Sequence, residues 1–369
     1  MNARRESFSI SPLDLHVVSG DGVDLSDVLL AEESGGAEAG RRAGAAVRAL
    51  VDAGALRPVG RALAVHELVA GDLRQWGIVA GVSVRDVVQG RVRLHEQTRS
   101  DREQALSDFL EAAGLDTAPV VLAHRDLSGL DAQIAAVAGR TADLELTTAD
   151  GVDHRVWIVN GADIAPFVET LGVLEGLTVL DGHHRVAAAV RRGDPEALLM
   201  AELVADHWVN VRSLDRRITL GDLSVPELLA RLSDVGVLTE VGDAEVVRPE
   251  GAHEILVHAG GRWQRLAFTE VNDDPVGGLP PVLLQARVLG PVLGVDDPRT
   301  DPRIEHLPGI VPLSDLARAD DDGHATFVPR ALTMAEIHAV ARSDRVLPPK
   351  STWVEPKPGP GVLVHLRTE

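Results

Sequence analysis

The most informative part of the sequence is Leu177-Thr178-Val179-Leu180-Asp181-Gly182-His183-His184-Arg185-Val186-Ala187-Ala188-Ala189. A mainly apolar strand ends at an acid, a glycine permits a tight turn, and a helix begins at once. Backbone N–H groups at a helix N-terminus attract anions, and the two imidazoles and the guanidinium add further donors. The stretch therefore predicts a phosphate-binding turn formed by Gly182, His183, His184 and Arg185.

Two other interpretations of the same turn stay open, a metal site and a polar helix cap. Asp181 could hold a divalent cation such as Mg²⁺, or it could orient a histidine. Because adjacent histidines point in different directions on a helix, one metal ion shared by both is disfavoured.

Strands and helices alternate on both sides of this turn between residues 62 and 192. Such alternation is typical of an α/β (α+β) fold. The expected strands are Ala62–Leu68, Gly77–Val84, Pro119–Ala123, Leu144–Thr148, Arg155–Val159 and Leu177–Leu180. The expected helices are residues 38–53, Ser100–Ala113, Asp163–Leu171 and Val186–Arg192, with a capping box over Ser100 to Glu103.

The second half of the chain is less regular. Its expected helices are Pro226–Leu232 with Ser224 as a cap, Pro281–Val292 and Ala335–Arg342. A hairpin is expected from Glu254–Val257 with Leu266–Thr269, and a loop over Asn272–Pro281. We therefore expect an N-terminal helical segment over residues 1–60, a core domain over 61–205, and a C-terminal α/β region over 206–369 that packs on the core.

Composition excludes several classes of protein. The 369-residue chain has no cysteine, so disulfides and thiolate chemistry are excluded. A formal net charge of −20 argues against a general nucleic-acid binder. No apolar run is long enough to span a membrane, and residues Met1 to Glu6 precede no apolar signal region. A cytoplasmic protein is expected, and homo-oligomer formation stays open.

Lysine is rare in this chain, although Lys and Arg together number 36. The two lysines, Lys350 and Lys357, lie in one proline-flanked segment, Leu347 to Lys357, that also contains Ser351 and Thr352. Since arginine does not fully replace the compact lysine ammonium, this segment is a candidate contributor to a phosphate site. The alternative is a loop with exposed lysines.

A second candidate is His95-Glu96, between an expected strand and an expected helix. A glutamate in such a loop can act as a general base if the fold brings it to the phosphates. An exposed, solvated pair is the simpler interpretation.

These residues belong to one ordered set: Gly90 to Thr98, Asp101-Arg102, Pro119-Val120, Trp157, Asp181 to Arg185, Pro348 to Thr352, and Pro356-Lys357. The set resembles a large bacterial and archaeal family built around a ParB/sulfiredoxin-like domain. Characterised relatives of that family include free L-serine kinases that use ADP or ATP. The resemblance covers about residues 60 to 365.

The resemblance implies a small-molecule kinase that binds ATP or ADP with Mg²⁺ and a small hydroxylated metabolite. Glu96 matches the catalytic base, Asp181 the acid near the reacting groups, and Gly182 to Arg185 the phosphate turn, which Lys350 would assist. His95, Ser351, Thr352 and Lys357 would support the substrate. The alternative is a non-catalytic nucleotide-binding protein with a regulatory or scaffold role, because fold does not fix function.

Overall fold

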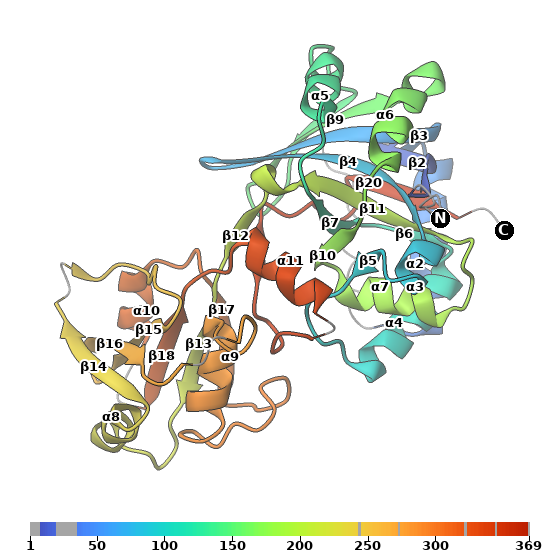
Figure 1. Ribbon diagram of the computed structural model, residues 1–369. Coiled ribbons are helices and arrows are strands. Elements are labelled where there is room, and N and C mark those ends of the chain that lie inside the picture. Colours follow the sequence, from blue (N-terminus) through green and yellow to red (C-terminus); the bar gives the residue numbers. More distant parts are fainter. Residues whose placement is uncertain are drawn as a thin grey trace, which may run out of the picture. The chain divides into compact units, whose positions relative to one another are not determined.

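The computed structural model describes residues 8–19, 35–242, 245–271, 274–320, 323–343 and 345–367 (Figure 1). Met1 to Glu6, on which the signal-peptide expectation rests, lie outside these residues. Residue contacts divide the chain into two compact units. The first unit comprises Met1–Leu94, Thr98–Asn210 and Glu355–Glu369, and the second comprises His95–Gln97 and Val211–Val354.

This division differs from the expected boundaries at residues 60 and 205. The last residues of the chain return to the first unit, because strand β20 (Leu363–Leu366) pairs with β2 (Leu13–Val18) and β6 (Leu115–Asp116). Residues 95–97 belong to the second unit, because Leu347 N–H donates to His95 O at 2.8 Å. Such pairings between distant segments leave no local signal in the sequence.

The expected N-terminal helical segment is only partly helical among its described residues. Helix α2 (Ala37–Asp52) is present, but β1 (Ile10–Ser11) and β2 precede it, and β3 begins at Leu56. The side chains of Leu13, Leu15 and Val17 are buried at every second position, as a strand with one covered face requires.

A mixed sheet forms the centre of the first unit. Its neighbouring strands are, in order, β5 (Val92–Arg93), β10 (Leu177–Asp181), β7 (Val120–His124), β11 (Leu198–Ala205), β4 (Leu73–Ser83), β3 (Leu56–Ala70), β2, β20 and β6. The pairs β10–β5 and β11–β7 are parallel. The expected hairpin is confirmed as β8 (Leu144–Thr147) with β9 (Asp153–Val159), which joins β3.

Helices cover both faces of this sheet. The core on one side contains α5 (Leu130–Ala138) and α6 (Ile164–Gly172), and the core on the other contains α2 and α4 (Ser100–Ala113). Helix α7 (His183–Arg191) follows β10 and lies beside α4 (Figure 1). A short helix, α3 (Val84–Val88), follows β4. The mixed α/β class is therefore confirmed.

The capping box expected at Ser100 is wrong. The residue before α4 is Arg99, which makes no side-chain capping bond. Glu103 instead accepts hydrogen bonds from Thr98 Oγ1 at 2.5 Å and from Arg191 Nη2 at 2.8 Å. The helix therefore begins one residue earlier than the motif requires, and its glutamate contacts α7.

The second unit contains an antiparallel sheet. Its strand order is β14 (Gly236–Val241), β16 (Arg262–Phe268), β15 (Glu254–Ala259), β18 (His324–Pro329), β13 (Leu214–Thr219) and β17 (Ile304–Pro308). The helices are α8 (Val225–Ser233), α9 (Pro280–Leu283), α10 (Leu313–Ala319) and α11 (Met334–Arg342). The expected hairpin and the Ser224 cap are confirmed. The helix expected over Pro281–Val292 continues from α9 as a π-helix over Leu284–Leu289.

The chain passes between the units in β12 (Asn210–Arg212) and β19 (Trp353–Glu355). Within the described ranges, no helix is long and apolar enough to cross a lipid bilayer.

Candidate functional site

The predicted turn lies in the first unit, where β10 ends at Asp181 and α7 begins at His183. Gly182 has φ 88°, a left-handed conformation that other residues adopt only at a cost. A Cβ atom on this glycine would lie 2.7 Å from Val120 Cγ1. Backbone conformation and the space available therefore both require glycine here.

Asp181 lies between two cations. Lys357 Nζ is 2.6 Å from Asp181 Oδ1, and Arg185 Nη2 is 3.4 Å from Asp181 Oδ2. All three side chains are partly exposed, at 34% for Lys357, 27% for Asp181 and 20% for Arg185. The start of α7 is thus a solvent-accessible helix N-terminus with an ammonium and a guanidinium beside it, which is the chemistry that binds phosphates.

The same cations set the charge of Asp181. Burial would raise the pKa of this carboxyl, but Lys357 and Arg185 outweigh burial and hold the pKa below its usual range. Asp181 is therefore ionised at neutral pH, and it aligns both cations.

The other predicted donors of the turn are partly engaged. His184 Nε2 accepts the Arg99 backbone N–H at 3.1 Å, so a neutral His184 ring carries its hydrogen on Nδ1. The ring of His183 is buried. Arg185 donates to the carbonyl oxygens of Ala118 and Pro119, the latter at 3.2 Å. Arg185 therefore also holds the start of β7 against the turn.

The remaining predicted residues meet in the second unit. Glu96 forms a parallel bridge with Leu347, and His95 Nε2 lies 3.1 Å from Thr352 Oγ1. Ser351 Oγ donates to Pro348 O at 2.5 Å. The structure thus brings together His95 and Glu96 with Lys350, Ser351 and Thr352, although more than 250 residues separate His95 from Thr352.

Glu96 is a perturbed carboxyl. Burial raises its pKa, while the backbone N–H groups and positive charge of Lys350, with Ser351 and Arg216, partly counteract burial. Lys350 itself has φ 60°, an uncommon left-handed conformation for a residue with a side chain. A glutamate with a raised pKa is suited to accept a proton near neutral pH.

Two residues of this group were not predicted from the sequence. Arg216 in β13 is buried and donates to Lys350 O at 2.8 Å. His306 in β17 lies opposite Arg216, and burial followed by the charges of Arg216 and Lys350 lowers its pKa to about 3. Neither residue lies in a recognisable motif, so only the folded structure reveals them.

The predicted residues thus form one group in each unit. Asp181 to Arg185 and Lys357 belong to the first, and the residues around Glu96 belong to the second. Glu96 belongs to one unit and the phosphate turn to the other. The expectation that Glu96 acts at the phosphate turn therefore stays a prediction.

The residues at the turn do not fit a magnesium ion held by protein alone. Asp181 is a single carboxylate, and both of its oxygens face cations. The described part of the chain contains no cluster of three or more His, Asp or Glu side chains able to hold a metal ion. A magnesium ion at Asp181 would therefore need several further oxygen ligands besides this one carboxylate.

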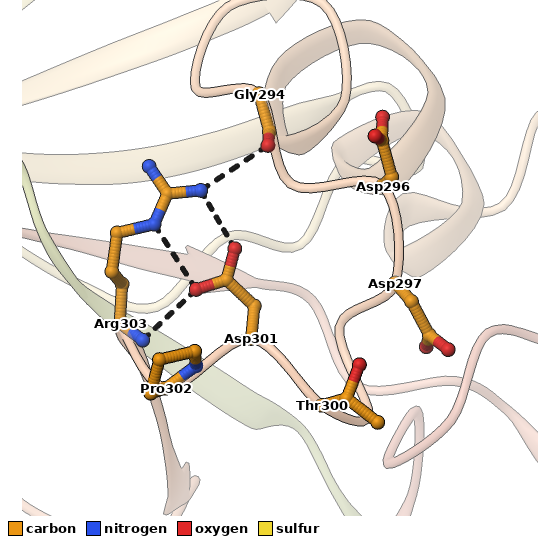
Figure 2. Close-up of a pocket in the computed structure, with 7 residues that line it drawn as sticks. All are labelled: Gly294, Asp296, Asp297, Thr300, Asp301, Pro302 and Arg303. Atoms are coloured by element: carbon orange, nitrogen blue, oxygen red, sulfur yellow. Dashed lines mark hydrogen bonds and ion pairs between the residues drawn. The ribbon is translucent and has the colours of Figure 1, made fainter.

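The second unit also contains an acidic cavity of about 440 Å³ (Figure 2). Asp296, Asp297, Thr300 and Asp301 line it, with Arg303. The Arg303 guanidinium lies 2.6 Å from Asp301 Oδ2 and donates to Gly294 O at 3.2 Å. Because Asp297 likewise pairs with Arg299, at 2.8 Å, salt bridges already neutralise much of this acidity.

Fold and site together describe a mixed α/β protein with a cation-lined strand-to-helix turn. The chain belongs to the DUF1015 family of proteins of unknown function, whose sequence pattern it matches over residues 22–285. No curated protein matches the sequence.

The solved structures that are similar to this chain include the following three, all at low identity. A mutant free serine kinase in complex with ADP is 16% identical, with a TM-score of 0.42 over 75% of this chain and 87% of that one. SbnI from Staphylococcus aureus with a C-terminal truncation is 12% identical, with a TM-score of 0.43 over 78% and 87%. A conserved hypothetical protein from Pyrococcus furiosus is 16% identical, with a TM-score of 0.38 over 75% and 90%. Likeness at this level says nothing about activity.

Proposed function

We propose that this protein is a small-molecule kinase that transfers a phosphoryl group from ATP or ADP to a hydroxyl group. The observation that carries the proposal is the pair of cations held by Asp181 at the N-terminus of α7. Phosphoryl transfer depends mainly on positioning the phosphates and neutralising their charge. Lys357, Arg185 and the first turn of α7 supply both functions.

In this proposal the first unit binds the nucleotide. The phosphates lie at the backbone N–H groups of His183 to Arg185, where the helix dipole favours negative charge. Asp181 keeps the Lys357 ammonium at the turn until the phosphates bind. We further propose that the first unit is a ParB/sulfiredoxin-like domain, as the sequence motifs imply.

Glu96 is the proposed general base. It accepts the proton of the acceptor hydroxyl as the hydroxyl oxygen bonds to the terminal phosphorus of the nucleotide. The bond between that phosphorus and its bridging oxygen breaks, and the shortened nucleotide leaves. Lys350 adds positive charge beside Glu96, and His95, Ser351 and Thr352 support the acceptor. Free L-serine is the acceptor that the motif resemblance suggests.

A second candidate is a nucleotide-binding protein without transferase activity. One observation favours it: Arg185 is already tied to the carbonyl oxygens of Ala118 and Pro119. A guanidinium fixed by two carbonyl oxygens can hold a bound phosphate in one place. It is less able to change position as the phosphoryl group is transferred.

The experiment is a phosphoryl-transfer screen with ATP and ADP as donors, Mg²⁺, and a panel of hydroxylated metabolites that includes L-serine. Mass spectrometry identifies any phosphorylated product. A product with one donor and one acceptor class supports the kinase. Calorimetric nucleotide binding without any product supports the second candidate, and the absence of binding contradicts both.

A further inference from the structure

A buried arginine of strand β13 forms hydrogen bonds with the loop next to Glu96. Arg216 is 3% exposed. Its Nη1 donates to Leu214 O at 2.5 Å, and its Nη2 donates to Lys350 O at 2.8 Å and to Pro349 O at 3.4 Å. One planar guanidinium thus connects β13 to the loop that contains Lys350.

This connection explains an unusual backbone conformation. Lys350 has φ 60°, which persists only where surrounding contacts hold it. The two loop carbonyls bound by Arg216 belong to Lys350 itself and to the residue before it. The N–H groups of Lys350 and Ser351 interact with the Glu96 carboxylate from the same loop. Arg216 therefore fixes the peptide groups next to the Glu96 carboxylate.

The charge of Arg216 also lacks an obvious structural purpose. Its neighbour Asp215 pairs with Arg248 instead, with Asp215 Oδ2 2.9 Å from Arg248 Nη2. Although burial lowers the pKa of Arg216 to about 10, the guanidinium stays charged at neutral pH. Among the residues that the structure describes, no carboxylate forms a salt bridge with Arg216. A buried charge of this kind is costly, so a purely structural role would be served better by a neutral residue.

We infer that Arg216 is the positioning residue of the Glu96 site, because its Nη2 donates to two carbonyl oxygens of the Lys350 loop, the loop that contacts the glutamate. Lys350 and Arg216 are the cations that act on Glu96. His306, opposite Arg216 on β17, is neutral at pH 7. The inference rests on the proposed role of Glu96 as base.

Two substitutions separate the fork from the charge. Arg216→Lys keeps the buried charge and loses the planar fork, whereas Arg216→Gln keeps an amide donor and loses the charge. Arg248→Lys is the matched control, because Arg248 lies in the same unit and contacts Ser213, Asp215 and Val311. Circular dichroism first establishes that each variant folds.

The measurements are turnover, nucleotide affinity, the Lys350 amide resonance, and the Glu96 titration midpoint by ¹³C NMR, assigned with Glu96→Gln. Arg216→Lys is expected to shift the Lys350 resonance and lower turnover by about 10²-fold, as small misplacements in active sites do, while nucleotide affinity is unchanged. Arg216→Gln is expected to raise the Glu96 midpoint. Arg248→Lys is expected to change neither the resonance nor the midpoint.

An unshifted Lys350 resonance with full turnover in Arg216→Lys would overturn the inference. So would an unchanged Glu96 midpoint in folded Arg216→Gln. If Arg216→Gln does not fold, the Lys350 resonance and the turnover of Arg216→Lys decide whether Arg216 positions the Lys350 loop. If the wild-type chain transfers no phosphoryl group, the proposed function fails, but the Lys350 resonance and the Glu96 midpoint still decide what Arg216 does.

Discussion

Lys357 and Asp181 are 176 residues apart in the chain, yet their side chains are 2.6 Å apart at the start of α7. In the proposed mechanism, the compact lysine ammonium moves from the carboxylate to the phosphates of the bound nucleotide. The second lysine, Lys350, lies instead with Glu96 in the other unit. The two lysines of the sequence therefore have different acidic neighbours, and they allow a matched comparison.

We predict that Lys357→Met weakens ATP or ADP binding by about 10-fold or more, since a charge-assisted hydrogen bond contributes roughly 1.5–3 kcal/mol. Lys350→Met is expected to lower turnover more than nucleotide affinity, because Lys350 lies with Glu96. Isothermal titration calorimetry measures the affinities. Equal nucleotide affinity in wild type and folded Lys357→Met would contradict the proposed role of Lys357.

The raised pKa of Glu96 predicts how turnover depends on pH. A base must be deprotonated, so turnover is lost as pH falls through the pKa of Glu96. Because burial raises that pKa, the loss should begin at a higher pH than for an exposed glutamate. A pH profile of kcat/KM checks this, and an acid limb at the position typical of an exposed carboxylate would count against Glu96.

A glycine lies at each end of α7, the helix that follows β10. Gly182 and Gly193 flank α7, and both have positive φ, 88° and 76°. A Cβ on Gly182 would meet Val120, whereas a Cβ on Gly193 would meet nothing within 4 Å. The two glycines therefore share backbone strain and differ in packing.

We predict that Gly193→Ala lowers the free energy of unfolding by about 1–2 kcal/mol, the cost of a left-handed residue. Gly182→Ala should cost about 1–3 kcal/mol more, since Val120 must move. Urea unfolding measures both variants. Val120→Ala should lower the free energy of unfolding less in the Gly182→Ala background than in wild type, because it removes the clash with the new Cβ atom. If the effects of the two substitutions are simply additive, the contact between residue 182 and Val120 is not the cause.

Most elements could be predicted from local patterns. The Leu177–Leu180 run next to Asp181-Gly182 indicated β10 and the start of α7, and the Ser224 cap indicated α8. The pairings of β20 with β2 and of Glu96 with Leu347 could not, because long-range pairing has no local signal. Arg216 was missed for the same reason, since its partners are backbone carbonyls of a distant loop.

Across the whole molecule, histidines with lowered pKa values link stability to pH. In the first unit, His66 Nδ1 lies 3.0 Å from Glu202 Oε2, and His66 Nε2 lies 3.0 Å from His154 Nδ1. The row of hydrogen bonds continues from His154 Nε2 to Thr148 Oγ1, at 3.3 Å. Burial, followed by the charge of His66, lowers the pKa of His154 to about 3. His306 in the second unit has its pKa lowered to about 3 as well.

The lowered pKa values of His154 and His306 make the folded protein less stable in acid. Between pH 6.5 and about 3, the unfolded chain binds protons that the folded histidines exclude, so stability falls as pH falls. Each such group contributes a slope of up to about 1.4 kcal/mol per pH unit. We predict a shallower slope for His154→Asn than for wild type in urea unfolding between pH 6.5 and 4. His253→Asn, which changes an exposed histidine, is the control, and a wild-type slope in His154→Asn would contradict this assignment.

The proposal that this protein is a kinase is tested most directly by product formation in wild type and Glu96→Gln, measured by mass spectrometry beside calorimetric nucleotide affinity. The expected result is a phosphorylated metabolite with wild type, a rate about 10²–10⁴-fold lower with Glu96→Gln, and equal nucleotide affinity in both proteins. Nucleotide binding by both proteins with no product from any hydroxylated acceptor would contradict the kinase and leave a nucleotide-binding module.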